Sequence, residues 1–398
     1  GLSETTVPET LQWMRQKIDR GLQIEEGQTF YHTGPHHDDI MLGYLPHIMH
    51  LTRTPLNRHQ FTIMTSGFTS VTNDYVIATL TRVSDLLAEG QIQMTQFPDF
   101  YESGYDLKRD KDVHHCLDSI AAGNEAGQWR GLSHRIIRSM VAIYGLRSTD
   151  ELTAKLQKIT TYLSGCYDGE MNPPEIQLLK GAIREFEEEL VWANLGVQEK
   201  DVSHLRLGFY TGDIFTEQPE IARDVAPVLA ELRELKPTVI TLALDPEGSG
   251  PDTHYKVLQT IAEAVRQWQQ EADLTGLRIW GYRNVWYRFN VASADMIIPV
   301  SLGTMAVMQN IFLSSYLSQK DASFPSHELD GPFSELTQKI WVAQYQELEL
   351  LLGKDFWYQN PHPRLRAAHG AIYLKEMGVD EFLSMARTLE KSMEGQAK

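Results

Sequence analysis

Imidazole and carboxylate side chains cluster at two places in the sequence. The stretch GPHHDD contains His36, Asp38 and Asp39, and the stretch DPEGSGPDTH ends in His254. His36 and Asp39 are three residues apart, which lets both side chains face one ion from the first turn of a helix. Two histidines and one carboxylate leave an open coordination position, as in catalytic zinc sites. The pattern indicates a metal site formed by His36, Asp39 and His254, with Asp38 available as a base.

The same residues also have a plain structural interpretation. An aspartate at the start of a helix commonly caps that helix. A histidine near the end of a strand is more often structural than a metal ligand. Because either stretch taken alone fits both interpretations, the residue types leave the metal site and the structural role open.

Both stretches follow a predicted strand. Residues 29–33 (TFYHT) are β-rich, and the apolar residues of 40–51 recur at helical spacing, so GPHHDD lies on a strand-to-helix turn. Residues 238–244 (TVITLAL) have the composition of a buried strand, and a helix is expected over 254–271. Ligands of open α/β sheets bind at the carboxyl ends of the strands, so this edge would position the cluster.

The remaining pattern predicts an α/β protein. Further strands are expected at 61–65, 205–210, 277–281 and 296–300, and further helices at 10–20, 73–92, 135–144, 149–163, 176–195, 220–234, 302–317, 333–352 and 380–393. Alternating strands and helices favour a Rossmann-like three-layer α/β/α fold with a mostly parallel sheet. We predict a single domain over 1–398. It would carry a helical insertion at about 73–180 and a helical C-terminal extension at about 302–398.

Composition excludes several classes of function. The chain has 36 Lys and Arg against 53 Asp and Glu, a formal net charge of −17, which argues against a general nucleic-acid binder and against docking on anionic lipid. No apolar run approaches the roughly 20 residues of a membrane helix. Two cysteines, Cys116 and Cys166, make no disulfide framework, and the N-terminus lacks a signal peptide, so we expect a cytoplasmic protein. Because the chain starts at Gly1, we also expect a cleaved tag or a piece of a longer protein.

Several motifs together resemble one family. GPHHDDIMLG resembles the Pro/Ala-His-Pro-Asp-Asp-Glu signature of the PIG-L/LmbE-like family, which comprises zinc-dependent N-deacetylases of amino sugars. Three other stretches resemble motifs of that family: Arg184-x-x-Glu187 ahead of Leu195-Gly196-Val197, KPTVITLALDPEGSGPDTH, and Ser318-Gln319. The similarity covers about 25–70 and 176–320. More narrowly, YRNVWYRF and SQKDASFPS resemble a bacterial subgroup in which this module follows a glucosamine-6-phosphate deaminase domain.

The resemblance implies roles for individual residues. His36, Asp39 and His254 would bind zinc, although a His-His-Asp set also accepts iron or manganese. Asp38 would be the general base. The implied fold is the same three-layer α/β type.

The chain departs from the family pattern near the site. Ile40 follows the aspartate pair where the family has an acid, at a position that is not a ligand. Pro251 stands where the second motif has its first His, which is thought to help stabilise the oxyanion. His37 replaces the usual Pro of the first motif and is a candidate substitute for that missing His.

Two functions follow from these observations. The first is a metal-dependent hydrolase that removes an acetyl group from an amino sugar, with N-acetylglucosamine 6-phosphate as one candidate substrate. The alternative, supported by Pro251, is a non-catalytic sugar-binding module that accompanies a glucosamine-6-phosphate deaminase. Deaminase activity of this chain itself ranks lowest, because none of that enzyme's active-site residues can be assigned. The sequence leaves open a homo-oligomer and a deaminase domain as partner.

Basic side chains could recognise a sugar phosphate, because the planar guanidinium matches phosphate geometry. The candidates are Arg184, Arg283, Arg288 and Lys320. The alternative for each is a surface or ion-paired role. Glu187 could orient Arg184 from one turn away, whereas Glu185, Glu188 and Glu189 are expected on a solvated helix face. His32 is expected to be buried and hydrogen-bonded.

Overall fold

The computed structural model describes residues 3–103, 109–213, 217–248, 252–285, 287–321 and 331–393. The chain divides into two compact units. The first comprises Gly1–Thr65, Leu205–Asn310 and Ser323–Lys398, and the second comprises Ser66–His204 and Ile311–Ala322. Each unit is described by itself, and the single domain over 1–398 stays a prediction.

The first unit contains most of the strands. Its elements in chain order are α1 (Thr6–Leu22), β1 (Thr29–Gly34), α2 (Asp39–Leu51), β2 (Arg58–Ile63), the short π-helix η5 (Ile221–Val225), α9 (Ala226–Leu235), β4 (Val239–Ala243), α10 (Thr253–Trp268), β5 (Arg278–Tyr282), β6 (Met296–Ser301), α12 (Phe333–Leu352), α13 (Lys354–Tyr358), α14 (Pro363–Arg366), β7 (Ala368–Gly378) and α15 (Val379–Met393). Helix α11 (Leu302–Ser315) begins in the first unit and ends in the second.

The sheet has seven strands, and the six that belong to the first unit follow the order β2-β1-β4-β5-β7-β6. Strand β1 pairs in parallel with β2 and with β4, and β4 pairs in parallel with β5. Strand β7 runs antiparallel to both of its neighbours, β5 and β6. The predicted mostly parallel sheet is therefore confirmed.

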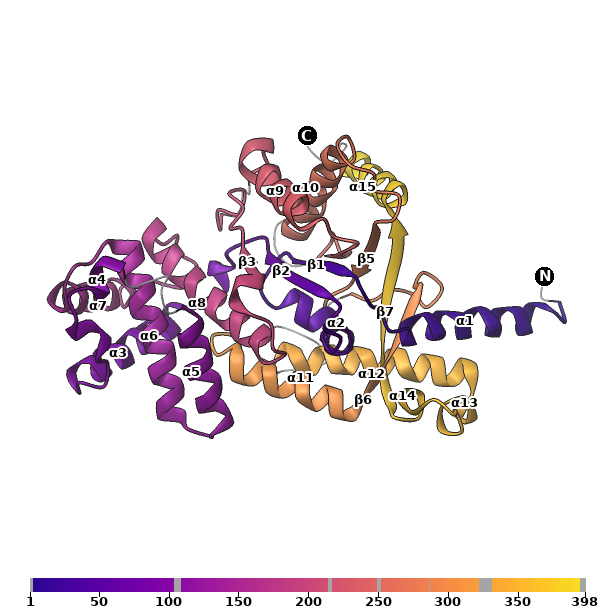
Figure 1. Ribbon diagram of the computed structural model, residues 1–398, viewed down its shortest axis with the longest axis horizontal. Coiled ribbons are helices and arrows are strands. Elements are labelled where there is room, and N and C mark those ends of the chain that lie inside the picture. Colours follow the sequence, from indigo (N-terminus) through magenta and orange to yellow (C-terminus); the bar gives the residue numbers. More distant parts are fainter. Residues whose placement is uncertain are drawn as a thin grey trace. The chain divides into compact units, whose positions relative to one another are not determined.

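Helices cover both faces of these strands (Figure 1). Helices α9, α10 and α15 lie over one face, and α2 and α12 lie over the other. Strand β4 is buried along its whole length, as expected of a parallel strand covered on both sides. Helix α10 buries Val257, Leu258, Ile261 and Val265 in the core that it shares with β4. The three-layer α/β/α arrangement is confirmed within this unit.

One predicted strand and part of the predicted helical C-terminal extension were wrong. Residues 205–210 form no strand, although the Leu207 N–H donates to the Met64 carbonyl over 2.8 Å. The strand lies just before, at Val202–His204. The C-terminal part is not purely helical, because β7 occupies Ala368–Gly378 and lies inside the sheet. Its apolar run is short and follows a cluster of Pro and Arg, and such runs do not distinguish a strand from a buried helix.

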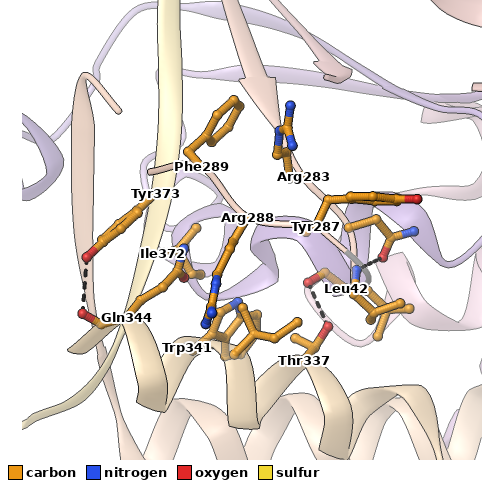
Figure 2. Close-up of a pocket in the computed structure, with 14 residues that line it drawn as sticks. Leu42, Arg283, Tyr287, Arg288, Phe289, Thr337, Trp341, Gln344, Ile372 and Tyr373 are labelled. Atoms are coloured by element: carbon orange, nitrogen blue, oxygen red, sulfur yellow. Dashed lines mark hydrogen bonds between the residues drawn. The ribbon is translucent and has the colours of Figure 1, made fainter. Parts of the chain in front are cut away.

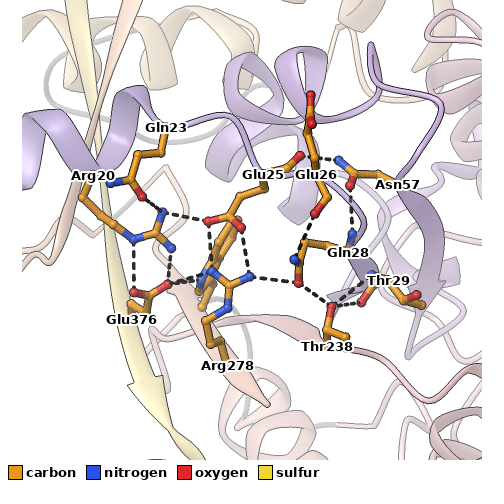
Figure 3. Close-up of polar contacts among 11 residues, drawn as sticks. Arg20, Gln23, Glu25, Glu26, Gln28, Thr29, Asn57, Thr238, Arg278 and Glu376 are labelled. Carbon is orange, nitrogen blue, oxygen red and sulfur yellow. Dashed lines mark hydrogen bonds and ion pairs between the residues drawn. The ribbon is translucent and has the colours of Figure 1, made fainter. Parts of the chain in front are cut away.

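Charged side chains form a closed network at the amino ends of the strands (Figure 3). We call Arg20, Glu25, Arg278 and Glu376 the amino-edge cluster. The Arg278 guanidinium donates to both Glu25 oxygens over 2.9 and 3.0 Å, and Arg20 lies 2.7 Å from the same carboxylate. Arg20 also donates to Glu376 from Nε, over 3.2 Å, and from Nη2, over 2.5 Å. Each carboxylate of this cluster therefore has guanidinium partners.

The second unit is mainly helical. Its elements are η1 (Phe68–Ser70), α3 (Asn73–Ala88), η2 (Met94–Gln96), α4 (Phe100–Ser103), α5 (Arg109–Ala121), α6 (Glu125–Tyr144), α7 (Thr149–Leu163), α8 (Pro174–Ala193), η4 (Glu199–Asp201) and β3 (Val202–His204). The predicted helical insertion at 73–180 lies within this unit. Its apolar core includes Leu80, Ile136, Met140 and Leu156. Among the residues described in either unit, no helix combines the length and apolar composition of a membrane span.

The acidic face of α8 is buried, which corrects the sequence prediction. Glu185, Glu187, Glu188 and Glu189 are all at most 3% exposed. The Glu189 carboxylate accepts hydrogen bonds from Arg109 and, over 2.6 Å, from Arg135. The sequence of α8 does not show that neighbouring helices supply cations, so the expected solvent exposure of Glu185, Glu188 and Glu189 was wrong, whereas Glu187 was expected to contact Arg184.

Candidate metal centre

Three predicted side chains converge at the carboxyl edge of the sheet. The ligand atoms of His36, Asp39 and His254 all lie within 4.8 Å of one another. Asp39 Oδ2 is 3.4 Å from His36 Nδ1 and 3.5 Å from His254 Nε2. Atoms about 2.0–2.2 Å from one ion in a tetrahedral set lie about 3.3 Å apart, so these spacings match a shared ion.

The local chain path explains this convergence. Strand β1 ends at Gly34 and α2 begins at Asp39, so His36 and Asp39 lie on one turn, where the His36 N–H donates to Asp39 Oδ2 over 2.6 Å. Strand β4 is parallel to β1 and ends beside it. His254 lies in the first turn of α10, the helix that follows β4.

Two glycines permit the close packing of this edge. A Cβ at Gly43 in α2 would lie 2.4 Å from the Tyr282 ring, so α2 contacts the end of β5 directly. A Cβ at Gly248 would lie 2.9 Å from His254 Nδ1. Side chains at either position would displace the elements that bear the three candidate ligands.

Buried carboxylates dominate the electrostatics of the centre. Asp39 and Asp245 are 1% and 0% exposed. Among the residues that the structure describes, their ion-pair partners are histidines and include no Lys or Arg. Burying a carboxylate without a compensating cation is strongly unfavourable. This edge therefore has a local excess of negative charge that a divalent cation would balance.

The pKa values reflect these surroundings. Burial raises the pKa of Asp39, but the His254 charge and the hydrogen bonds from His36 outweigh it and leave the pKa below its ordinary value. Burial also raises the pKa of Asp245. Burial lowers the pKa of His254, whereas Asp39 and Asp245 oppose this and raise it to about 9. A metal would have to displace a proton from His254, so metal binding here would release protons.

Asp38 does not cap the helix that it precedes. It occupies the N-cap position of α2, yet its side chain accepts no capping hydrogen bond. It is partly exposed, and its charge contributes to the raised pKa of His254. The capping interpretation of Asp38 was therefore wrong, and a carboxylate near the three converging side chains remains.

Sequence reasoning missed two residues of this centre. Asp245 lies two residues after the end of β4, and its Oδ1 accepts from His254 Nδ1 over 2.8 Å. Asn284 follows β5, and its side chain donates to Asp39 Oδ1. Both lie just beyond predicted strands, so their position at strand ends could have indicated them. The sequence pattern indicates two strand ends, whereas the structure brings the ends of β1, β4 and β5 together.

The predicted phosphate-binding residues of the first unit lie around a hollow next to this centre (Figure 2). The hollow holds only about 20 Å³, the space of one water molecule. Arg288 lines it and is exposed, whereas Arg283 lies 3.0 Å from Glu247 and stacks over Phe289. The Arg288 side chain points toward Trp341 and Gln344 of α12. His37 is buried on the turn between β1 and α2.

The remaining predicted site residues belong to the second unit or are not described. Arg184 is buried and donates to Glu187 over 3.0 Å, and Glu187 also accepts from the Ser318 backbone over 2.6 Å. Lys320 is exposed. Pro251 lies outside the described residues. His32, in the first unit, is buried and hydrogen-bonded to Tyr44 and His59, which confirms its predicted structural role.

Comparison with known proteins gives one relative in sequence. No protein-family model matches the chain. The chain is 28% identical over 267 residues to a glucosamine-6-phosphate deaminase-like protein of Bacteroides thetaiotaomicron. The match covers 61% of this chain and 38% of the relative, so the chain spans about two fifths of that protein's length. This similarity agrees with the predicted link to deaminase-like proteins.

A solved structure gives a weaker likeness. The chain is 13% identical to N,N'-diacetylchitobiose deacetylase from Pyrococcus horikoshii, solved with its inhibitor MPG. The alignment covers 96% of this chain and 95% of that one, with a TM-score of 0.39. A likeness at this TM-score supports no conclusion on function.

Proposed function

We propose that this protein is a metal-dependent hydrolase that removes the acetyl group from an N-acetylated amino sugar. The observation that carries the proposal is the convergence of His36, Asp39 and His254 within 4.8 Å at the carboxyl edge of the sheet. The PIG-L/LmbE-like motifs support the reaction type. The amino-sugar phosphate in the name of the Bacteroides relative supports the substrate class.

The residues fit a catalytic metal ion. Two imidazole nitrogens and one carboxylate oxygen are the donor set of open zinc sites, and iron or manganese would also suit them. Their spacing is close to that of atoms sharing one ion, and the two buried carboxylates of Asp39 and Asp245 lack Lys or Arg partners among the described residues. Donor chemistry, spacing and charge therefore point to the same occupant.

Amide hydrolysis needs a strong nucleophile, stabilisation of the oxyanion and a proton for the leaving amine. A divalent cation at this centre would activate water and polarise the amide carbonyl. The Asp38 carboxylate would accept the proton of the attacking water and deliver it to the amine nitrogen. Asp245 would keep His254 oriented through the Nδ1 hydrogen bond.

Arg288 is the best-placed candidate for a phosphate on the substrate. It borders the hollow shared with Asn284, which contacts Asp39. Its guanidinium has no ion pair among the described residues, whereas Arg283 pairs with Glu247. We therefore propose a phosphorylated amino sugar as the preferred substrate.

Pro251 favours one alternative function. If the missing motif His is essential for turnover, the chain would be a sugar-binding module that keeps its metal without catalysis. Both functions predict metal binding, so only turnover separates them.

Acetate release distinguishes the two functions. Purified protein with added Zn²⁺ should release acetate from N-acetylglucosamine 6-phosphate, and a chelator should abolish the release. Asp38→Asn should lower kcat by about 10²- to 10⁴-fold while metal content stays unchanged. The exposed Asp74→Asn is the matched control and should leave kcat unaltered. Bound metal without acetate release across a panel of N-acetyl sugars would favour the binding module.

A further inference from the structure

We propose that Asn284 is the positioning residue that sets the geometry of both halves of the metal centre. This inference rests on the proposed metal-binding function. In this role Asn284 acts through Asp39 on one side and through Asp245 and His254 on the other. Three polar groups of Asn284 make separate hydrogen bonds: the side-chain NH₂ to Asp39, the backbone N–H to Asp245, and the side-chain oxygen from the Val285 N–H.

The side-chain amide of Asn284 selects the oxygen that Asp39 offers to a metal. Its Nδ2 donates to Asp39 Oδ1. Asp39 Oδ2 is the oxygen that lies 3.4 and 3.5 Å from the two histidines. Because Oδ1 is engaged by Asn284, Oδ2 faces the shared position, which favours a monodentate carboxylate. Without this donor, the bond from the His36 N–H to Oδ2 would be the remaining backbone contact that orients the carboxylate among the described residues.

The backbone of Asn284 positions the other half. Its N–H donates to Asp245 Oδ2 over 3.0 Å, while Asp245 Oδ1 accepts from His254 Nδ1 over 2.8 Å. Because Nδ1 of His254 is bound to Asp245, the other ring nitrogen, Nε2, faces Asp39 Oδ2 and the position that a metal ion would occupy. Partners of this kind orient metal-binding histidines and tune their affinity.

The side chain at position 284 must donate a hydrogen bond to Asp39 and accept one from the Val285 N–H, which an amide can do. Asn284 Oδ1 accepts from the Val285 N–H over 2.6 Å, so the amide is oriented and its NH₂ group points at Asp39. Asn284 is 7% exposed. An aspartate of the same shape could not donate to Asp39 and would add a like charge beside it. Leucine would leave the Asp39 oxygen without this donor.

Metal affinity and coordination geometry test the proposal directly. Zn²⁺ affinity is measured by competition with a chromophoric chelator, and geometry by the visible absorption of the Co²⁺-substituted protein. Asn284→Ala should weaken Zn²⁺ binding by about 10- to 100-fold and alter the Co²⁺ spectrum. Asn290→Ala in the same loop is the matched control, because its side chain bonds only locally to the Ala292 N–H, and it should change neither.

Coupling between the two halves gives a second test. Asp245→Ala should also weaken Zn²⁺ binding, and the double variant should lose less affinity than the product of the two single losses, because both act on one network. If Asn284→Ala does not fold, Asp245→Asn serves instead and should weaken binding about 10-fold. A thermal midpoint of the metal-free protein records any purely structural damage.

The outcomes separate this inference from the proposed function. Zn²⁺ affinity within twofold of the unmodified chain and an unchanged Co²⁺ spectrum in Asn284→Ala would overturn the positioning role, whatever its thermal midpoint. The proposed hydrolase would be unaffected by that result. Conversely, a chain that binds Zn²⁺ in an Asn284-dependent way but releases no acetate would retain the inference and lose the hydrolase. Failure of the unmodified chain to bind any divalent metal would overturn both.

Discussion

The two edges of one sheet carry polar clusters that differ in composition and in charge balance. At the amino edge, Glu25 and Glu376 each contact guanidinium groups, with Arg20 and Arg278 between them. At the carboxyl edge, the ion-pair partners of the buried Asp39 and Asp245 are imidazoles. Both clusters are formed by side chains brought together from distant parts of the sequence.

The comparison shows how a structural cluster differs from a functional one. The amino-edge cluster satisfies its own charges, so nothing further is needed to stabilise it. The carboxyl-edge cluster contains acids in excess, and Asp39 and Asp245 raise the pKa of His254. Perturbed, buried titratable groups of this kind gather at functional sites. Four predictions can break or sharpen this contrast.

Removal of one carboxylate should have its largest effect at the carboxyl edge. Asp39→Ala should weaken Zn²⁺ binding by more than about 100-fold, because the loss of a ligand exceeds the loss of a supporting hydrogen bond. Glu376→Ala at the amino edge is the control and should leave metal content unchanged. Metal content is measured by elemental analysis after dialysis against Zn²⁺. Full retention of metal by Asp39→Ala would contradict the ligand assignment.

Acid should destabilise the fold through histidines that are buried in neutral form. Burial, together with nearby positive charge from Arg364, lowers the pKa of His47 to about 3. Its pKa in the unfolded chain is near 6.5, so the unfolded state binds the extra proton first. Stability is therefore full above pH 6.5 and falls by about 1.4 kcal/mol per pH unit as the pH drops toward 4.

Urea unfolding at pH 7 and at pH 5 measures this effect. His47→Phe should reduce the difference between the two pH values, since both ring nitrogens of His47 lack hydrogen-bond partners among the described residues. The exposed His114→Phe is the matched control. Equal pH dependence in the unmodified chain and in His47→Phe would refute this origin of acid sensitivity.

Disruption of the amino-edge cluster should lower stability without affecting chemistry. Glu25→Ala should cost about 1–2 kcal/mol, a value reduced because the pair with Arg278 is partly exposed to solvent. Thermal unfolding measures the loss, and acetate release by the same variant should keep its kcat. A fall in kcat at full occupancy of the metal would show that the two edges are coupled.

Arg288 should show the smallest effect. Arg288→Ala should raise KM for the phosphorylated sugar by about 2- to 5-fold, since one exposed charge pair contributes about 1 kcal/mol or less. KM for unphosphorylated N-acetylglucosamine should not change. Equal effects on both sugars would remove Arg288 from phosphate recognition.

The parallel strands β1 and β4 could be predicted from the sequence alone. Hydrophobic patterns before GPHHDD and before DPEGSGPDTH placed β1 and β4 within two residues of their bounds, and parallel strands necessarily meet at one edge. That is why His36, Asp39 and His254 could be grouped although more than 200 residues separate them. The pattern has no comparable signal for β7, whose partners are distant in sequence and antiparallel.

Other parts of the centre depend on three-dimensional surroundings. Asn284 and Asp245 act through hydrogen bonds, and an Asn or Asp after a strand more often forms a turn. In the second unit, the buried Glu189 of α8 is paired with Arg109 and Arg135 from other helices. Periodicity cannot show such partners, because it describes one element at a time.

Strand β7 has a consequence for synthesis of the chain. It lies between β5 and β6, yet it is made last, about 70 residues after β6. Until residue 378 leaves the ribosome, β6 has no neighbour in the sheet and β5 has an open side. Nascent or truncated chains that stop before residue 368 would therefore expose unpaired backbone, which promotes aggregation.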